Sequence, residues 1–200
     1  NLAITSHPHR VEVPAGATSG FGVTAMGSLP IRYQWQFNGK DLAGGTNRFL
    51  SLKNVSMAFE GDYAVVVSDA RGSSMISRAA SLAILVKPGF AQAPLSQSVV
   101  AGGNVTLSAQ ITGNPAPFTY QWRKGDSFAN STVVSESLSS EKAVFLALTN
   151  VQPADAGTYR LCVANAAAPD ISSTSPNRSF LLTVLPDTDG DGLPDEWENA

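Results

Sequence analysis

The tripeptide Tyr-Gln-Trp occurs twice in this chain, at Tyr33-Gln34-Trp35 and at Tyr120-Gln121-Trp122. Each copy precedes the same downstream pattern, Phe-Leu-x-Leu-x-Asn-Val followed by Gly-x-Tyr, which runs from Phe49 to Tyr63 and again from Phe145 to Tyr159. The two tryptophans stand 87 positions apart. That period is the length of a small domain and exceeds the repeats of about 20–50 residues that build solenoids. We therefore expect two copies of one folding unit.

The composition is that of a folded, β-rich protein. The chain has 200 residues, of which 43% are hydrophobic and 14% are charged, against a usual charged fraction of about 25%. The net charge is −3 and the sequence has no stripe of Lys and Arg, so we expect neither nucleic acid nor an anionic membrane as a partner. No apolar run approaches the roughly 20 residues of a membrane-spanning helix.

Short alternating apolar runs, separated by Gly, Pro, Asn and Ser, predict strands almost throughout the chain. Regularly spaced short strands are typical of an antiparallel sandwich or barrel. The repeat then divides the chain into a first domain at 1–86, a linker at 87–90, a second domain at 91–185 and an acidic C-terminal segment at 186–200.

The chain resembles the immunoglobulin superfamily, in particular the disulfide-free, I-set-like repeats of large bacterial surface and secreted proteins. In this family a Trp packs in the core, and a Tyr two residues before the second Cys forms the tyrosine corner. The resemblance gives the first role to Trp35 and Trp122, and the second to Tyr63 and Tyr159. It implies an all-β fold, with two Ig-like antiparallel β-sandwiches in tandem and a short C-terminal calcium-loop segment.

The resemblance also implies that apolar side chains replace each family disulfide. Val65 and Leu161 stand two residues past the corner tyrosines, and alignment gives Val23 and Ala109 as their partners. Burial of an aliphatic side chain contributes about 1.5–3 kcal/mol, so two of them are comparable with the roughly 2–4 kcal/mol of a disulfide. Because side chains alternate along a strand, we expect the only cysteine, Cys162, on the outer face of the sheet.

The second unit carries a longer polar insertion, 126–142, after its Tyr-Gln-Trp strand. It is interpreted either as an irregular connection or as a loop that contacts a ligand, since loops carry most binding function on such scaffolds.

The acidic segment contains the one strong chemical motif. Residues 187–198 match D-x-[DN]-x-[DN]-G-x5-E in full. Calcium takes six to eight oxygen ligands from a loop that wraps one ion, and Gly192 permits the sharp turn. Crowded carboxylates repel one another without a cation. The pattern predicts a Ca²⁺ site whose ligands are five carboxylates and one backbone carbonyl, from Asp187, Asp189, Asp191, Leu193, Asp195 and Glu198.

Two features distinguish this segment from a standard EF-hand. Pro186 and a predicted strand precede the loop, where an EF-hand has a helix, and Pro194 has no N–H to pair with a sister loop. The segment therefore resembles the single loops of thrombospondin type 3 and dockerin-like repeats. The chain ends two residues past the motif, so we expect a truncated loop that binds Ca²⁺ weakly.

No Ser/His/Asp set is expected, because both histidines, His7 and His9, lie at the extreme N-terminus. We therefore expect a non-enzymatic structural, spacer or adhesion module of a larger secreted or cell-surface bacterial protein. The alternatives are a glycan- or protein-binding module and the accessory region of a secreted enzyme, such as a glycoside hydrolase, whose catalytic domain lies outside this segment.

The calcium loop also bears on location. Weak calcium sites, with dissociation constants of about 10⁻⁴–10⁻³ M, occur in extracellular modules, and we expect an extracellular or cell-surface address. The expected partners are neighbouring domains of the same polypeptide and an extracellular protein or glycan, with no membrane insertion in this segment.

Overall fold

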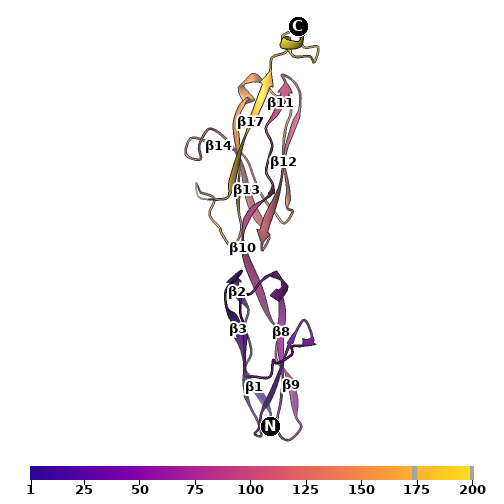
Figure 1. Cartoon of the computed structure of the whole chain (residues 1–200), viewed down its shortest axis with the longest axis vertical. Helices are drawn as coiled ribbons and strands as arrows, with labels where there is room; N and C mark the ends of the chain where they lie inside the picture. The colour runs from indigo at the N-terminus through magenta and orange to yellow at the C-terminus, as the bar shows by residue number, and fades with distance from the viewer. Residues whose placement is uncertain (173–174, 199–200) are drawn as a thin grey trace. The chain divides into compact units, whose positions relative to one another are not determined.

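The computed structural model describes residues 1–172 and 175–198. The chain forms two compact units, Asn1–Val86 and Lys87–Ala200, each built mainly from β-strands (Figure 1). We expected a linker at 87–90, but these residues continue strand β10 (Ala80–Gln92). Pro88 and Gly89 do not end the strand, because the backbone of β10 is paired before and after them. It pairs with β8 before Lys87 and with β12 in the second unit.

The first unit contains a mostly antiparallel sheet in the order β2-β10-β8-β5-β6, with β9 also paired to β8. Its strands are β2 (Val11–Pro14), β5 (Arg32–Phe37), β6 (Lys40–Asp41), β8 (Gly61–Ser68), β9 (Ser74–Ile76) and the first part of β10. The opposing strands pair two by two and are β1 (Ala3–Ser6) with β4 (Thr24–Met26), and β3 (Ser19–Gly22) with β7 (Phe49–Leu52). A 3-10 turn, η1 (Met57–Phe59), precedes β8.

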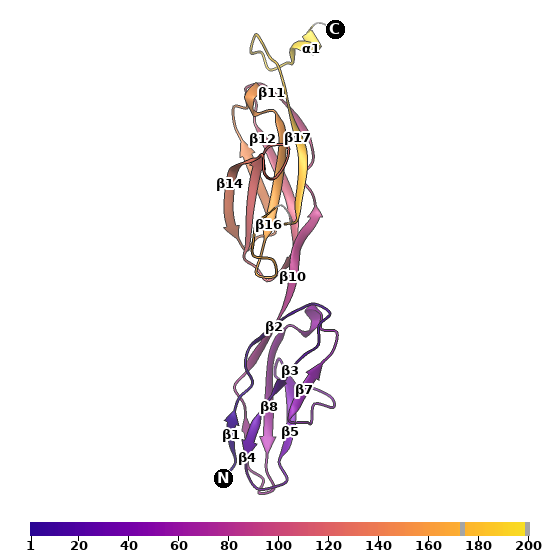
Figure 2. The same cartoon turned by 90° about the vertical axis from the view of Figure 1, so that its left-hand side faces the viewer.

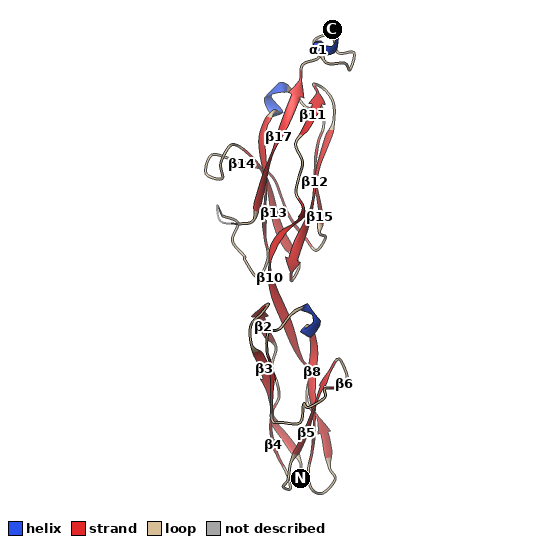
Figure 3. Cartoon of the chain, viewed as in Figure 1, coloured by secondary structure: helices blue, strands red, loops and turns tan. Residues whose placement is uncertain are grey.

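The second unit repeats this plan with longer strands (Figure 3). One sheet has the order β11-β17-β16-β13-β14 and the other has the order β15-β12-β10. The new strands are β11 (Gln97–Val100), β12 (Val105–Asn114), β13 (Phe118–Lys124), β14 (Thr132–Ser139), β15 (Ala143–Leu148), β16 (Gly157–Ala164) and β17 (Asn177–Leu185). The turn η2 (Pro153–Asp155) precedes β16, and helix α1 (Asp195–Glu198) follows the sheet.

Each unit has one hydrophobic core centred on its Tyr-Gln-Trp tryptophan. Trp35 and Trp122 are fully buried, as the sequence predicted. Trp35 packs near Phe21, with ring centroids 6.1 Å apart, and Trp122 meets Phe180 edge-on at 6.0 Å. The four residues expected in place of the family cysteines are all buried in these cores, which confirms that packing replaces the bridges: Val23, Val65, Ala109 and Leu161.

The same pair of turns locks the strand ends in both units. Gly16 donates its N–H to the carbonyl of Val55 at 2.7 Å, and Gly102 donates to Val151 at 2.7 Å. Both glycines have left-handed φ, +84° and +81°, which a residue without Cβ adopts at little cost. The asparagine directly before each of these valines, Asn54 or Asn150, also has a left-handed φ. The repeat in sequence is therefore a repeat in backbone conformation.

Cys162 lies outside the core cluster that holds Leu161 and Val163, as alternation predicts for the outer face, but it is fully buried there, which the sequence did not predict. By register it stands between Gln121 on β13 and Asn177 on β17. Arg123 donates to the Gln121 side chain at 2.9 Å, and Arg160 donates to the Asn177 side chain at 2.8 Å. The two long side chains therefore bond to the residues that flank the cysteine on the neighbouring strands.

The insertion 126–142 is neither an irregular connection throughout nor an open loop. Its second half forms strand β14, which pairs with β13 along the full length of that strand. Arg123 holds the first half, because its guanidinium donates to the Ser131 hydroxyl at 2.8 Å and lies 4.5 Å from the centre of the Phe128 ring. The polar composition of this segment suggested a loop, but backbone pairing with β13 makes its second half a strand.

Candidate metal centre

The acidic loop follows the last strand of the second unit directly. Strand β17 ends at Leu185, Pro186 follows, and the loop closes at α1 (Figure 2). The N–H of Asp195 donates to the carbonyl of Pro186 at 3.0 Å, and this bond joins the two ends of the loop. A strand therefore enters the loop, as the sequence predicted, in place of the entering helix of an EF-hand.

Three of the predicted ligands lie together. Carboxylate oxygens of Asp187, Asp189 and Asp191 all lie within 4.8 Å of one another. Backbone N–H groups organise them, since Asp187 accepts bonds from Gly190 at 2.8 Å and from Gly192 at 3.0 Å. Each carboxylate has about four lone-pair sites, so these bonds leave oxygen capacity for a cation.

The other predicted ligands among the described side chains, Leu193 and Asp195, are not part of this cluster of three carboxylates. The Asp195 carboxylate accepts two bonds from Thr188, at 2.7 Å from its N–H and at 2.7 Å from its hydroxyl. These bonds from Thr188 lower the pKa of Asp195 and keep it ionised. The N–H of Leu193 donates to Asp191 at 2.8 Å. The side chain of Glu198 lies outside the described part of the chain.

The donor set fits a hard divalent cation. It consists of carboxylate oxygens, with no sulfur or imidazole within the described cluster, and this chemistry suits Ca²⁺ or Mg²⁺ rather than zinc or copper. Asp189 and Asp191 are exposed and Asp187 is half-buried. A hollow of about 370 Å³ separates the loop from the β11–β12 turn, and it is lined by Val100, Ala101, Gly102, Gly103, Asp187, Gly190 and Gly192.

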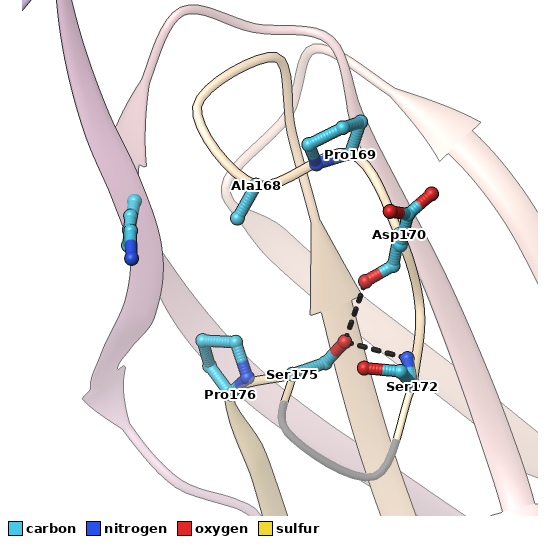
Figure 4. Close-up of a pocket in the computed structure, with 7 residues that line it drawn as sticks. Ala168, Pro169, Asp170, Ser172, Ser175 and Pro176 are labelled. Carbon is cyan, nitrogen blue, oxygen red and sulfur yellow. Dashed lines mark hydrogen bonds between the residues drawn. The ribbon is translucent and has the colours of Figure 1, made fainter.

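A second hollow in this unit, of about 300 Å³, is lined by Lys87 and by residues of the 168–176 segment, among them Asp170, Ser172 and Ser175 (Figure 4). The Ser175 hydroxyl, on its wall, donates to the carbonyl of Asp170 at 2.7 Å and accepts the N–H of Ser172 at 2.7 Å. The Ser175 hydroxyl is therefore engaged within the segment. Among the described residues, no helix has the length and apolar character that a membrane crossing requires.

Comparison with known proteins agrees with this architecture. Residues 87–165 match the family model described as "Immunoglobulin domain". A solved structure, Dpr11 IG1 bound to DIP-gamma IG+IG2, superposes with a TM-score of 0.70 at 16% identity, and covers 92% of this chain and 98% of that one. This chain is a tandem of immunoglobulin-like domains.

Curated relatives extend the likeness to both Ig-like domains. Mouse hemicentin-1 is 28% identical over 90% of this chain, and the human cell adhesion molecule DSCAML1 is 25% identical over 81%. The chain spans only 3% and 8% of the lengths of these two proteins. Both relatives come from animals, mouse and human.

Two exposed aromatic side chains were not identified in the sequence analysis. Phe49 and Phe145, the first residues of the repeated Phe-Leu-x-Leu pattern, are 66% and 60% exposed. The signal was present, because the two leucines of each pattern alternate along the strand, one buried and one half-buried, and place the leading Phe on the opposite face.

Proposed function

We propose that this segment is a non-catalytic structural and adhesion module of a larger extracellular or cell-surface protein. The observation that carries the proposal is the likeness of both Ig-like domains to hemicentin-1 and to a protein named as a cell adhesion molecule. Two sandwiches with packed cores and no described catalytic constellation suit a spacer that presents surfaces. A bacterial source has only the disulfide-free cores in its favour, and stays a prediction.

A partner protein is part of the same proposal. The structural neighbour Dpr11 is bound to DIP-gamma through Ig domains, which supports protein binding by a fold of this kind. The test is adhesion itself. Beads coated with the 200-residue chain should capture cells or extracellular matrix, and beads coated with chain unfolded by heat should not. Equal capture by both preparations would contradict the adhesive role.

We further propose that the C-terminal loop binds Ca²⁺. Support comes from the three clustered carboxylates and from the backbone bonds that hold them in a loop. A cation would relieve the repulsion among the carboxylates and fasten the segment that follows β17. We expect a dissociation constant of about 10⁻⁴–10⁻³ M, the range of extracellular modules.

Isothermal titration of the chain with CaCl₂ tests this. Asp189→Ala removes a carboxylate from the centre of the cluster and should abolish the heat. Glu196→Gln is the matched control, since Glu196 carries the same charge in the same segment but stands at a position of the motif that has no ligand role. Absence of heat with the unmodified chain, or equal loss in both variants, would overturn the calcium site.

A further inference from the structure

Phe49 and Phe145 occupy equivalent places in the two domains. Phe49 is the first residue of β7, and Phe145 is the third residue of β15. Phe49 pairs with Gly22 on β3, and Phe145 pairs with Ser108 on β12. Both rings point away from their cores and are more than half exposed. A single exposed aromatic ring is common on protein surfaces and is not by itself a site, so the surroundings of the two rings decide whether either belongs to one.

The surroundings differ at one position. A Cβ atom on Gly22 would lie 2.8 and 2.9 Å from two ring carbons of Phe49, so the ring rests directly over the glycine backbone. Ser108 has a side chain at the equivalent position. The Phe49 ring is further held by Arg48, whose guanidinium carbon lies 5.1 Å from the ring centre. Phe49 is thus a ring fixed in place, with most of its surface still open.

A hollow of about 340 Å³ lies beside this ring, with Phe49, Gly20, Gly22, Thr24, His7 and His9 among its lining residues. Its volume is at the lower end of the range for small-ligand sites, about 300–1,000 Å³. The glycines provide a floor without side chains. No described residue that lines the hollow is acidic, so it does not suit a hard cation such as Ca²⁺ or an organic cation.

The polar groups of the rim are oriented in advance. The Nδ1 atom of His7 accepts the N–H of Arg78 at 3.0 Å, which makes Nε2 the N–H donor of the neutral ring. The guanidinium of Arg48 is already engaged, because it donates to the Val23 carbonyl at 2.9 Å and to the Thr24 hydroxyl at 2.8 Å. No Lys, Arg, Asp or Glu is among the described residues that line the hollow, so the lining offers imidazole, hydroxyl and backbone groups rather than a permanent charge.

We propose that this hollow binds one neutral sugar ring of a glycan. A pyranose has an apolar face of C–H groups that packs on an aromatic ring, and hydroxyls at its edge that bond to imidazole and hydroxyl groups. The fixed ring, the bare glycine floor and the uncharged polar rim match both halves of such a ligand. The proposal goes beyond the adhesive and calcium-binding roles and depends on neither.

A glycan array probed with the 200-residue chain, followed by NMR titration with the free neutral hexoses and N-acetylhexosamines, tests the site. We expect binding to neutral saccharides, with shifts confined to the hollow of the first domain. Phe49→Ala should weaken binding by about tenfold or more, as loss of a central aromatic anchor does. Phe145→Ala, the equivalent exposed ring without this hollow, should leave binding unchanged.

Gly22→Ser sharpens the test, because it copies the residue that the second domain has at Ser108. The new Cβ displaces the Phe49 ring, so binding should fall although the serine is compatible with the fold. A circular dichroism spectrum and a melting curve like those of the unmodified chain establish folding. The proposal is overturned by an array with no neutral-saccharide signal, by binding only of acidic sugars or of peptides, or by equal losses in Phe49→Ala and Phe145→Ala.

Discussion

The hydroxyl of Tyr63 donates a hydrogen bond to the carbonyl oxygen of Phe59 at 2.9 Å. In the second domain Tyr159 makes the same bond to Asp155, also at 2.9 Å. Both tyrosine rings are buried, so each ties a strand in the core to the 3-10 turn that precedes it. The corner survives in the first domain although Phe59 stands where the second domain has an Asp, because the bond uses only the backbone carbonyl.

Replacement of Tyr63 by Phe should therefore cost about 0.5–1.5 kcal/mol of unfolding free energy, the net value of a typical hydrogen bond. Burial raises the pKa of Tyr63, so the hydroxyl stays a donor across the neutral range. Urea unfolding followed by circular dichroism measures the loss. Tyr33→Phe, which removes a hydroxyl from a half-buried ring on β5, should change stability little; an equal cost in both variants would contradict the corner.

The two core tryptophans predict unequal effects of the same substitution. The indole N–H of Trp35 donates to the carbonyl of Asn47 at 2.9 Å, whereas that of Trp122 is buried without a hydrogen-bond partner among the described residues. Trp35→Phe loses packing and a bond, and Trp122→Phe loses packing alone. We expect Trp35→Phe to be more destabilising by about 1 kcal/mol. Calorimetry of both variants decides this, and a larger cost for Trp122→Phe would refute it.

Cys162 should be unreactive in the folded protein. Burial raises the pKa of its thiol, while the positive charges of Arg123 and Arg160 partly oppose that rise. Only the thiolate attacks disulfide reagents, so labelling with Ellman's reagent should be slow in buffer and fast in guanidinium chloride. Ser179→Cys, which adds a thiol at an exposed position of β17, provides the fast folded-state reference. Rapid labelling of Cys162 without denaturant would show that its face is open.

Asp69 links stability of the first domain to pH. Burial by itself raises the pKa of this carboxyl, but the N–H groups of Ser28, Ser73 and Arg71 outweigh that effect, and the pKa is lowered. A lowered native pKa means that the contribution is fully present above the unfolded value of about 4. It is lost as pH falls through the native value.

Asp69→Ala should accordingly lower the melting temperature clearly at pH 7, and by much less at pH 3. Asp62→Ala, at an exposed carboxylate of the same domain, is the comparison. Melting curves of the three proteins at both pH values measure the effect. A deficit for Asp69→Ala that does not shrink at low pH would mean that the carboxylate charge is not what stabilises the turn.

Much of the fold could be predicted from the sequence because its signals are local and repeated. The resemblance to the immunoglobulin superfamily gives the places of Trp35, Trp122 and both corner tyrosines, and alignment of the two repeats gives the aliphatic replacements of the cysteines. Alternation gives the face of Cys162 but not its burial, because burial depends on the side chains of neighbouring strands. Periodicity describes which face a residue occupies and cannot describe what else lies over that face.

The candidate sites were also predictable from the sequence only in part. The carboxylates of Asp187, Asp189 and Asp191 come together as the motif predicts, since a short loop determines their spacing. Asp195 bonds to Thr188 instead, a choice made by local hydrogen-bond geometry. The hollow beside Phe49 depends on Gly22, a residue that carries no signal in the sequence until its strand partner is known. Cross-strand register is the information that a single sequence lacks.

The paired turns at Gly16 and Gly102 have a further consequence for which sequences can form them. Each domain has the same two backbone bonds, from Gly16 to Val55 and from Val55 to Ala17, and from Gly102 to Val151 and from Val151 to Gly103. Because these bonds use no side chains, the turn restricts the sequence only where the backbone φ is left-handed, at each glycine and at the asparagine before each valine. The other residues of the turn are free to differ between the two domains, as Ala17 and Gly103 do.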